Sequence, residues 1–111
     1  MKLYNVSDLA LNNKGEYVLG SADLHTHACY LVYGVLNPDE KGRVIKPGKG
    51  HEEIVCVVSG EVFLIGEKET FALKAGEAFY LRGEESYLMD NNGEGNAVYV
   101  ISGGHSEHHE H

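Results

Sequence analysis

The sequence predicts an all-β domain, a sandwich or barrel of about eight short strands, and three observations favour this fold class. Glycine recurs at short intervals, with 14 in a chain of 111 residues. β-Branched and aromatic residues fill the segments between the glycines, as is typical of strands separated by turns. No stretch longer than a turn or two keeps the apolar spacing of a helix. Short strands bury their apolar faces by closing into a sandwich or a barrel.

The elements of the first half are delimited by turn residues. They are a helical turn at residues 7–11 and strands at 17–19, 24–36 and 42–46. Pro38 and Pro47 follow the last two of these strands. Because proline has no backbone N–H, each proline marks the point where a strand leaves its ladder.

The second half shows the same pattern with shorter intervals. The strands are expected at residues 54–58, 62–65, 70–73, 78–81, 86–89 and 97–101. The first two of them are separated by Ser59-Gly60-Glu61 alone. Since so short a Gly-containing connection favours antiparallel pairing of its flanks, we expect a hairpin across this turn.

Charge and cysteine usage exclude several classes of partner. The formal net charge is −8, with 9 Lys and Arg against 17 Asp and Glu. No basic face is therefore expected to neutralise phosphates, which excludes nucleic acid and an anionic membrane as partners. No apolar run reaches a membrane span of about 20 residues and no signal-peptide block is evident, so a cytoplasmic protein is expected. Cys29 and Cys56 lack CxxC spacing and lie in apolar segments, which favours buried thiols over a metal knuckle, with a disulfide left open.

Two spaced motifs lie within residues 48–91. In the first, Glu53 is followed after six residues by Gly60. In the second, Gly76 is the first residue and Asn91 is the last, and the two lie at the distance that the motif requires. On an all-β background, this pair of motifs resembles the cupins, which are double-stranded β-helix or jelly-roll barrels found in small metalloenzymes and sugar-binding proteins. The resemblance implies a single cupin domain over residues 1–102.

The resemblance also implies which metal ligands are missing. Metal-binding cupins hold Fe, Mn, Ni, Zn or Cu through two His and the Glu of the first motif and one His of the second. This chain keeps only Glu53 of these four. If the first motif is counted back from Glu53 without gaps, its two His positions fall on Lys49 and Pro47. If the loop is instead shortened, both His positions are deleted. Tyr87 stands at the second-motif His position. A lone carboxylate holds borderline metals weakly, so the usual His-x-His site is not expected.

A displaced metal site remains an alternative. His51 precedes Glu53 by two residues, and His25 and His27 repeat that spacing earlier in the chain. Alternate residues of an extended strand face the same side, so these four side chains could form a three-His, one-carboxylate set for Zn, Ni, Fe or Mn. Otherwise His25 and His27 form a hydrated strand end or a dimer contact, and His51 packs in a loop.

Glu53 is also the first of three candidate ligand-lining residues, with Arg82 and Tyr87. Adjacent strand residues face opposite sides, so only one of Glu52 and Glu53 enters the barrel, and the cupin resemblance selects Glu53. A carboxylate in an apolar barrel needs a cation or hydrogen-bond donors. Arg82 and the Tyr87 phenol are candidate partners, as are His51 and Lys49. The alternative is a structural ion pair, with Tyr87 filling the volume of a lost metal.

The segment 29–36 and the C-terminus suggest further partners. Tyr30 and Tyr33 have opposite parity, and the run 29–36 is apolar on both faces, so we expect a partner subunit to cover one face and form a homodimer. Residues 103–111 form a His- and Glu-rich tail in which His105, His108, His109 and His111 could chelate a transition metal weakly. A disordered acidic tail or a cloning remnant are the alternatives.

Three functions follow, in this order. The first is a small-molecule-binding module without the usual metal site. The second is a metal-dependent enzyme, an oxygenase or isomerase, that uses the displaced His and Glu set. The third is metal buffering through the tail. Cupin-like barrels host unrelated chemistries, so the sequence identifies neither the ligand nor the metal.

Overall fold

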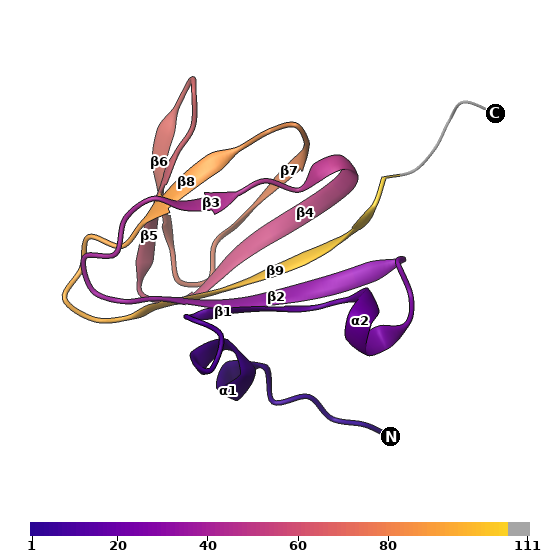
Figure 1. Ribbon diagram of the computed structural model, residues 1–111. Helices are drawn as coiled ribbons and strands as arrows, with labels where there is room; N and C mark the ends of the chain where they lie inside the picture. The colour runs from indigo at the N-terminus through magenta and orange to yellow at the C-terminus, as the bar shows by residue number, and fades with distance from the viewer. Residues whose placement is uncertain (107–111) are drawn as a thin grey trace.

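The structure is a computed structural model, and it describes residues 1–106. Two antiparallel sheets face each other across one core, with β2 and β9 side by side in one and β3 and β8 in the other (Figure 1). The five-stranded sheet has the order β1-β2-β9-β4-β7 and comprises β1 (Glu16–Leu19), β2 (Cys29–Leu36), β9 (Ala97–His105), β4 (Gly48–Ser59) and β7 (Ala78–Gly83). The four-stranded sheet has the order β3-β8-β5-β6 and comprises β3 (Arg43–Ile45), β8 (Tyr87–Asp90), β5 (Glu61–Ile65) and β6 (Thr70–Lys74). The predicted all-β jelly-roll fold is confirmed.

The core lies between the sheets because apolar residues alternate along the strands. In β4, Glu53, Val55 and Val57 are buried, whereas Ile54 and Val58 between them are exposed. The buried apolar cluster draws on both sheets and comprises Val32, Leu36, Ile45, Val55, Val57, Val62, Leu64, Leu73, Leu81, Met89, Ala97, Tyr99 and Ile101. Glu53 therefore shares the inner face of β4 with core residues, as predicted.

The expected strand at 24–36 is too long at its start. Residues Ser21–Leu24 form a helical turn, α2, and β2 begins only at Cys29. His25 ends α2 with a left-handed φ of 59°. A left-handed residue reverses the chain direction locally, so residues 25–28 form a loop. The alternation argument for His25 and His27 therefore does not apply.

The expected hairpin between residues 54–58 and 62–65 is wrong. β4 pairs with β7 and β9, whereas β5 pairs with β6 and β8 in the other sheet. The chain crosses between the sheets at Gly60, where φ is 80° and an added Cβ would lie 3.0 Å from the Cα of Ala97. Glycine is required there by both backbone conformation and space. The hairpin in this region joins β5 to β6, across residues 66–69.

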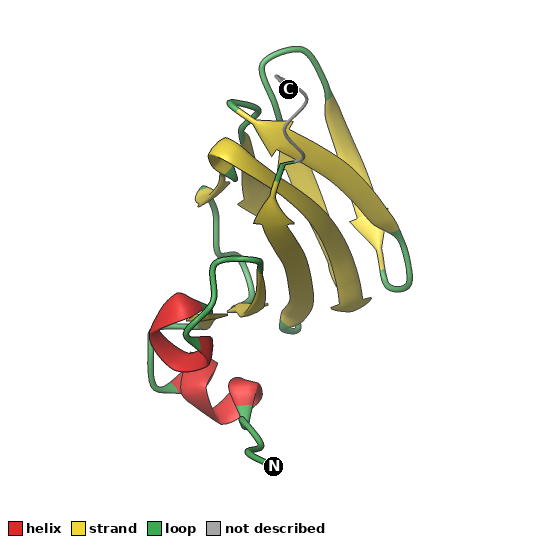
Figure 2. Cartoon of the chain, turned by 90° about the vertical axis from the view of Figure 1, so that its right-hand side faces the viewer, coloured by secondary structure: helices red, strands yellow, loops and turns green. Residues whose placement is uncertain are grey.

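The N-terminal segment packs on the edge of the five-stranded sheet. Helix α1 (Val6–Leu11) is capped by the Asn5 side chain, which accepts a hydrogen bond from the Asp8 N–H at 3.1 Å. Its buried residue, Ala10, lies where α1 packs against β1 and β2. Figure 2 shows both helices gathered at one end of the strands. Within residues 1–106, no helix is long and apolar enough to cross a membrane.

The outer face of the five-stranded sheet keeps apolar side chains in contact with solvent. Ile54 and Val58 of β4 and Tyr80 of β7 are each more than half exposed, at 52%, 55% and 53%. Both cysteines are free thiols, Cys56 being half-buried and Cys29 exposed. The predicted burial of Cys29 is wrong because β2 begins at this residue, beyond the packed part of the strand.

Candidate functional site

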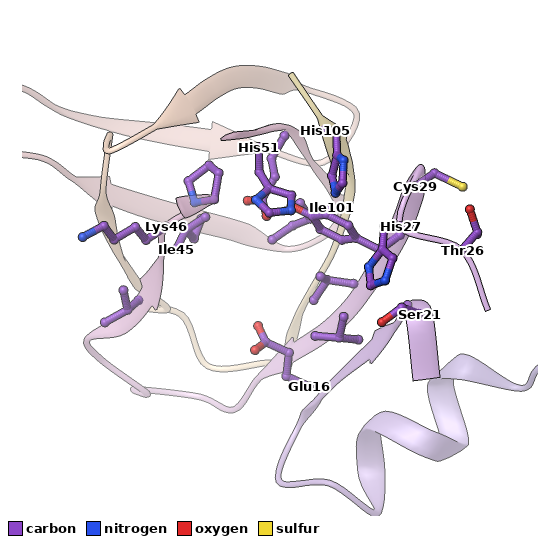
Figure 3. A pocket seen from close by; sticks show the side chains of 17 residues that line it. Glu16, Ser21, Thr26, His27, Cys29, Ile45, Lys46, His51, Ile101 and His105 are labelled. Atoms are coloured by element: carbon purple, nitrogen blue, oxygen red, sulfur yellow. The ribbon is translucent and has the colours of Figure 1, made fainter. Parts of the chain in front are cut away.

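A cavity of about 380 Å³ opens between the two sheets. Its lining comes from β1, β2, β4 and β9 of one sheet, from β3 of the other, and from the loop at residues 25–28. Its polar side chains include two carboxylates, Glu16 and Glu53, and three imidazoles, together with Ser21, Thr26, Tyr30 and Lys46. Figure 3 shows Glu16 and the imidazoles of His27, His51 and His105, with apolar side chains beside them. An apolar cavity with a few convergent polar groups is the usual form of a small-molecule site.

Glu53 is the buried charged group of this cavity, with 7% of its surface exposed. The Tyr30 hydroxyl donates a hydrogen bond of 2.6 Å to Oε2. The other oxygen, Oε1, is buried and has no hydrogen-bond partner among the described residues. A buried carboxylate oxygen without a donor is costly, so the cavity holds an acceptor that a ligand could satisfy.

The surroundings of Glu53 raise the pKa of its carboxyl above the usual value. Burial raises the pKa of the Glu53 carboxyl, and the nearby Glu16 carboxylate raises it further. The Tyr30 hydrogen bond and the charge on His51 act in the opposite direction. Burial, followed by the hydrogen bond to Glu53, also raises the pKa of the Tyr30 phenol, which therefore remains a donor.

Tyr30 reaches Glu53 because a glycine lies opposite it in the neighbouring strand. Tyr30 of β2 pairs with Gly103 of β9. A Cβ at residue 103 would lie 2.5 Å from the Tyr30 hydroxyl oxygen and 2.6 Å from Cε1, so only glycine leaves room for the ring. The same strand pair repeats the arrangement in reverse, where Tyr99 of β9 lies over Gly34 of β2 and donates a hydrogen bond to Glu16.

Three histidines gather beside Tyr30. His51 and His105 are directly opposite each other in β4 and β9, with ring centroids 5.0 Å apart. His27, in the loop before β2, stacks on His105 at 6.2 Å. The Tyr30 ring lies 5.9 Å from that of His51. The structure thus brings together His27, His51 and Glu53 of the displaced set and adds His105, which the sequence had placed in the tail.

His25 does not line this cavity, because it caps α2. Residues 103–105 of the expected tail belong to β9, while His108, His109 and His111 lie outside the described residues. Within residues 1–106, no group of three or more His, Cys, Asp or Glu side chains is arranged to hold a metal ion. The donor set therefore does not fit the metal that the cupin resemblance implies.

The other two ligand-lining candidates lie elsewhere. Tyr87 packs edge-on against Phe71 and Phe79, and its hydroxyl donates to Glu69 at 2.9 Å. Arg82 is exposed in β7 and does not line the cavity. The phenol that contacts the carboxylate is that of Tyr30, not Tyr87. The position of Tyr30 in its strand indicates which face its side chain takes. The residues around Tyr30 do not show that β2 pairs with β9, and this pairing brings the phenol to Glu53.

Asn91, the last residue of the second motif, is structural. It is 2% exposed, and its Nδ2 donates to the carbonyl oxygens of Leu36 at 3.0 Å, Asn37 at 3.0 Å and Gly95 at 2.9 Å. Its Oδ1 accepts from the Gly93 N–H at 2.9 Å. Asn91 thus joins the end of β2 to the loop before β9. The retained Gly60 and Asn91 therefore maintain the fold.

Comparison with known proteins gives a fold. No protein-family model and no curated protein matches the sequence. A cupin protein from Bacteroides fragilis is 17% identical, with a TM-score of 0.71 over 100% of this chain and 86% of that chain. The Cupin_2 domain of an XRE family transcriptional regulator from Enterobacter cloacae is 17% identical, with a TM-score of 0.67 over 84% of this chain and 99% of that one.

A third solved structure is titled a sugar phosphate isomerase from a cupin superfamily, from Silicibacter pomeroyi. It is 14% identical, with a TM-score of 0.64 over 96% of this chain and 68% of that chain. At identities this low, structural similarity shows a shared fold and does not show a shared activity. With its two facing sheets, its inward Glu53 and its sheet crossing at Gly60, this chain has the cupin fold.

Proposed function

We propose that this protein binds a small organic molecule in the cavity between the two sheets, where Glu53 Oε1 accepts a hydrogen bond from the ligand. The observation that carries the proposal is the buried Oε1, which has no hydrogen-bond partner among residues 1–106, inside a cavity of about 380 Å³. Leaving a buried acceptor without a donor costs about 1–3 kcal/mol, and a bound donor recovers this cost. A ligand that donates to this oxygen is therefore expected to stabilise the folded protein.

The neighbouring groups suit recognition more than structural packing. Tyr30 fixes Oε2, so the carboxylate is oriented and only Oε1 remains for a ligand. His51 approaches the same region from β4. A cavity of this size is within the range of small-molecule sites, about 300–1,000 Å³. The apolar side chains of Val32 and Ile101 can bury the body of a ligand.

The metal-dependent alternatives have less support. An oxygenase or isomerase with displaced ligands needs convergent donors, and the described side chains do not converge in that way. Metal buffering would rest mainly on residues beyond 106. Both functions stay predictions, and the name of the isomerase neighbour does not by itself assign its reaction to this chain.

A fragment screen by protein-observed NMR tests the proposal. We expect bound fragments to shift the backbone amide signals of His51, Glu53 and Tyr30, the residues that surround Oε1. Glu53→Gln should weaken these fragments at least tenfold, because it replaces the free acceptor with an amide. Glu52→Gln is the matched control, since it removes the same charge from the adjacent residue, whose carboxylate accepts a hydrogen bond from Tyr80.

Two outcomes would contradict the proposal. In the first, fragments shift only residues away from the cavity. In the second, Glu53→Gln and Glu52→Gln weaken the fragments equally, which would show that general acidity, and not the buried acceptor, governs binding.

A further inference from the structure

We infer that the group bound at Glu53 is a protonated amine, carried on a compact apolar body. This inference rests on the proposed function and names the ligand class of the same cavity. Its basis is the balance of charges around Oε1, together with the apolar walls beside it.

The cavity contains more negative than positive side chains. Glu16 and Glu53 both line it from the five-stranded sheet. Lys46 is the ammonium among the lining residues, and it also lies 3.6 Å from Glu84. Arg43 is engaged with Glu40 at 2.7 Å and with the Tyr99 hydroxyl, and it does not line the cavity. With histidine counted as neutral, the cavity carries an excess of carboxylate.

Neutral donors satisfy Oε1 less well than an ammonium does. A hydrogen bond is roughly twice as strong when one partner is ionised, and an ammonium at a carboxylate adds the attraction between two opposite charges. The effect is larger here because Glu53 is buried and little screened by water. The same burial raises the pKa of Glu53, and His51 offsets this effect only in part. An ammonium at Oε1 would supply a cationic partner.

The remaining contacts define the rest of the ligand. An ammonium has three hydrogens, so one can reach Oε1 while others face the imidazole of His51. Val32, Ile45 and Ile101 line the cavity and can pack against a hydrocarbon ring or chain. The cavity therefore fits a small primary amine with an apolar body.

Three probes of one size separate the ligand classes: cyclohexylamine, cyclohexanol and cyclohexanecarboxylate. We expect cyclohexylamine to bind the unaltered protein at pH 7.5 at least tenfold more tightly than cyclohexanol, with the carboxylate weakest, as measured by NMR titration. Glu53→Gln should remove the amine preference. Glu52→Gln should keep it, because that carboxylate belongs to a residue outside the cavity lining.

A second measurement does not depend on a variant. In the unaltered protein, saturating cyclohexylamine should move the titration of the Glu53 side-chain carbon signal to lower pH, whereas cyclohexanol, which supplies a neutral donor, should move it less. The titratable and charged groups that face Glu53 during this titration are Tyr30 of β2, His51 of β4, Glu16 of β1, His105 of β9, His27 of the loop before β2, and Lys46 after β3. Their signals are followed in parallel.

The possible failures are distinguishable. Glu53-dependent binding of cyclohexanol equal to that of the amine would overturn the amine assignment and leave the proposed binding function in place. An amine preference that survives Glu53→Gln would also overturn it, because the amine would then bind other acidic groups. Absence of amine binding overturns it as well, while the fragment screen judges the cavity itself.

Discussion

Gly103→Ala should separate Tyr30 from Glu53, and its cost can be worked out from the structure. The new Cβ would lie 2.6 Å from Cε1 of Tyr30, whereas carbon atoms pack at about 3.5–4.0 Å. The ring must therefore move by about 1 Å. The same movement lengthens the 2.6 Å hydrogen bond to Glu53 beyond bonding distance.

Two terms add to the cost of this substitution. Overpacking a filled site costs about 1–3 kcal/mol, and loss of a hydrogen bond to a charged group costs about 1.5–3 kcal/mol. We expect a loss of about 3–5 kcal/mol in the free energy of unfolding, with a fall in Tm of more than about 10 °C. Urea denaturation, followed by circular dichroism, measures this loss.

A double-mutant cycle with Tyr30→Ala isolates the contact. Without the ring, Gly103→Ala should cost less than about 1 kcal/mol, since the nearest atoms to its Cβ belong to Tyr30. Gly95→Ala is the control, because its added Cβ meets nothing within 4 Å, and it should change stability by less than about 0.5 kcal/mol. An equal cost of Gly103→Ala in both backgrounds would refute the reasoning.

Four further outcomes are expected. Because the pKa of Glu53 is raised, the wild type loses stability as pH rises through that pKa, so the stability of Glu53→Gln relative to wild type should increase from pH 4 to pH 8 in urea titrations. Asn91→Ala should lower the free energy of unfolding by about 2–3 kcal/mol, since it removes buried hydrogen bonds. Protein purified without a nickel column should contain well under one transition-metal ion per chain by mass spectrometry, and a stoichiometric ion would contradict the donor arrangement. Sedimentation should detect a homodimer that Ile54→Glu dissociates, because Ile54 lies on the exposed apolar face.

The sequence predicted the strands well and their partners poorly. Alternation placed Glu53 and Glu52 on opposite faces because this follows from the period of a single strand, and the cupin resemblance selected Glu53 as the inward residue. The hairpin predicted at Gly60 was wrong because the sequence of a short turn is the same whether the flanking strands pair with each other or enter different sheets. The start of β2 failed because the left-handed conformation of His25 has no clear sequence signal.

The site was predicted only in part, for the same reason. His27 and His51 were found from spacing and Glu53 from its place in a motif, and the three share a cavity. Tyr30 was missed as the partner of Glu53, because the contact depends on how β2 lies against β9 and on the gap at Gly103. Tyr87 was assigned by its place in a motif, but its ring packs against Phe79 and does not line the cavity.

The reciprocal Tyr–Gly pairs also determine how β2 and β9 align. A slip of two residues would keep every side chain on its own face, so apolar alternation alone permits it. Such a slip would set Tyr30 against Ile101 or His105, with no glycine to admit the ring, and would displace Tyr99 from Gly34 in the same step. Only one register of β2 and β9 therefore places each of the two tyrosine rings over a glycine. Any tolerated change at one member of a pair should be accompanied by a change at the other.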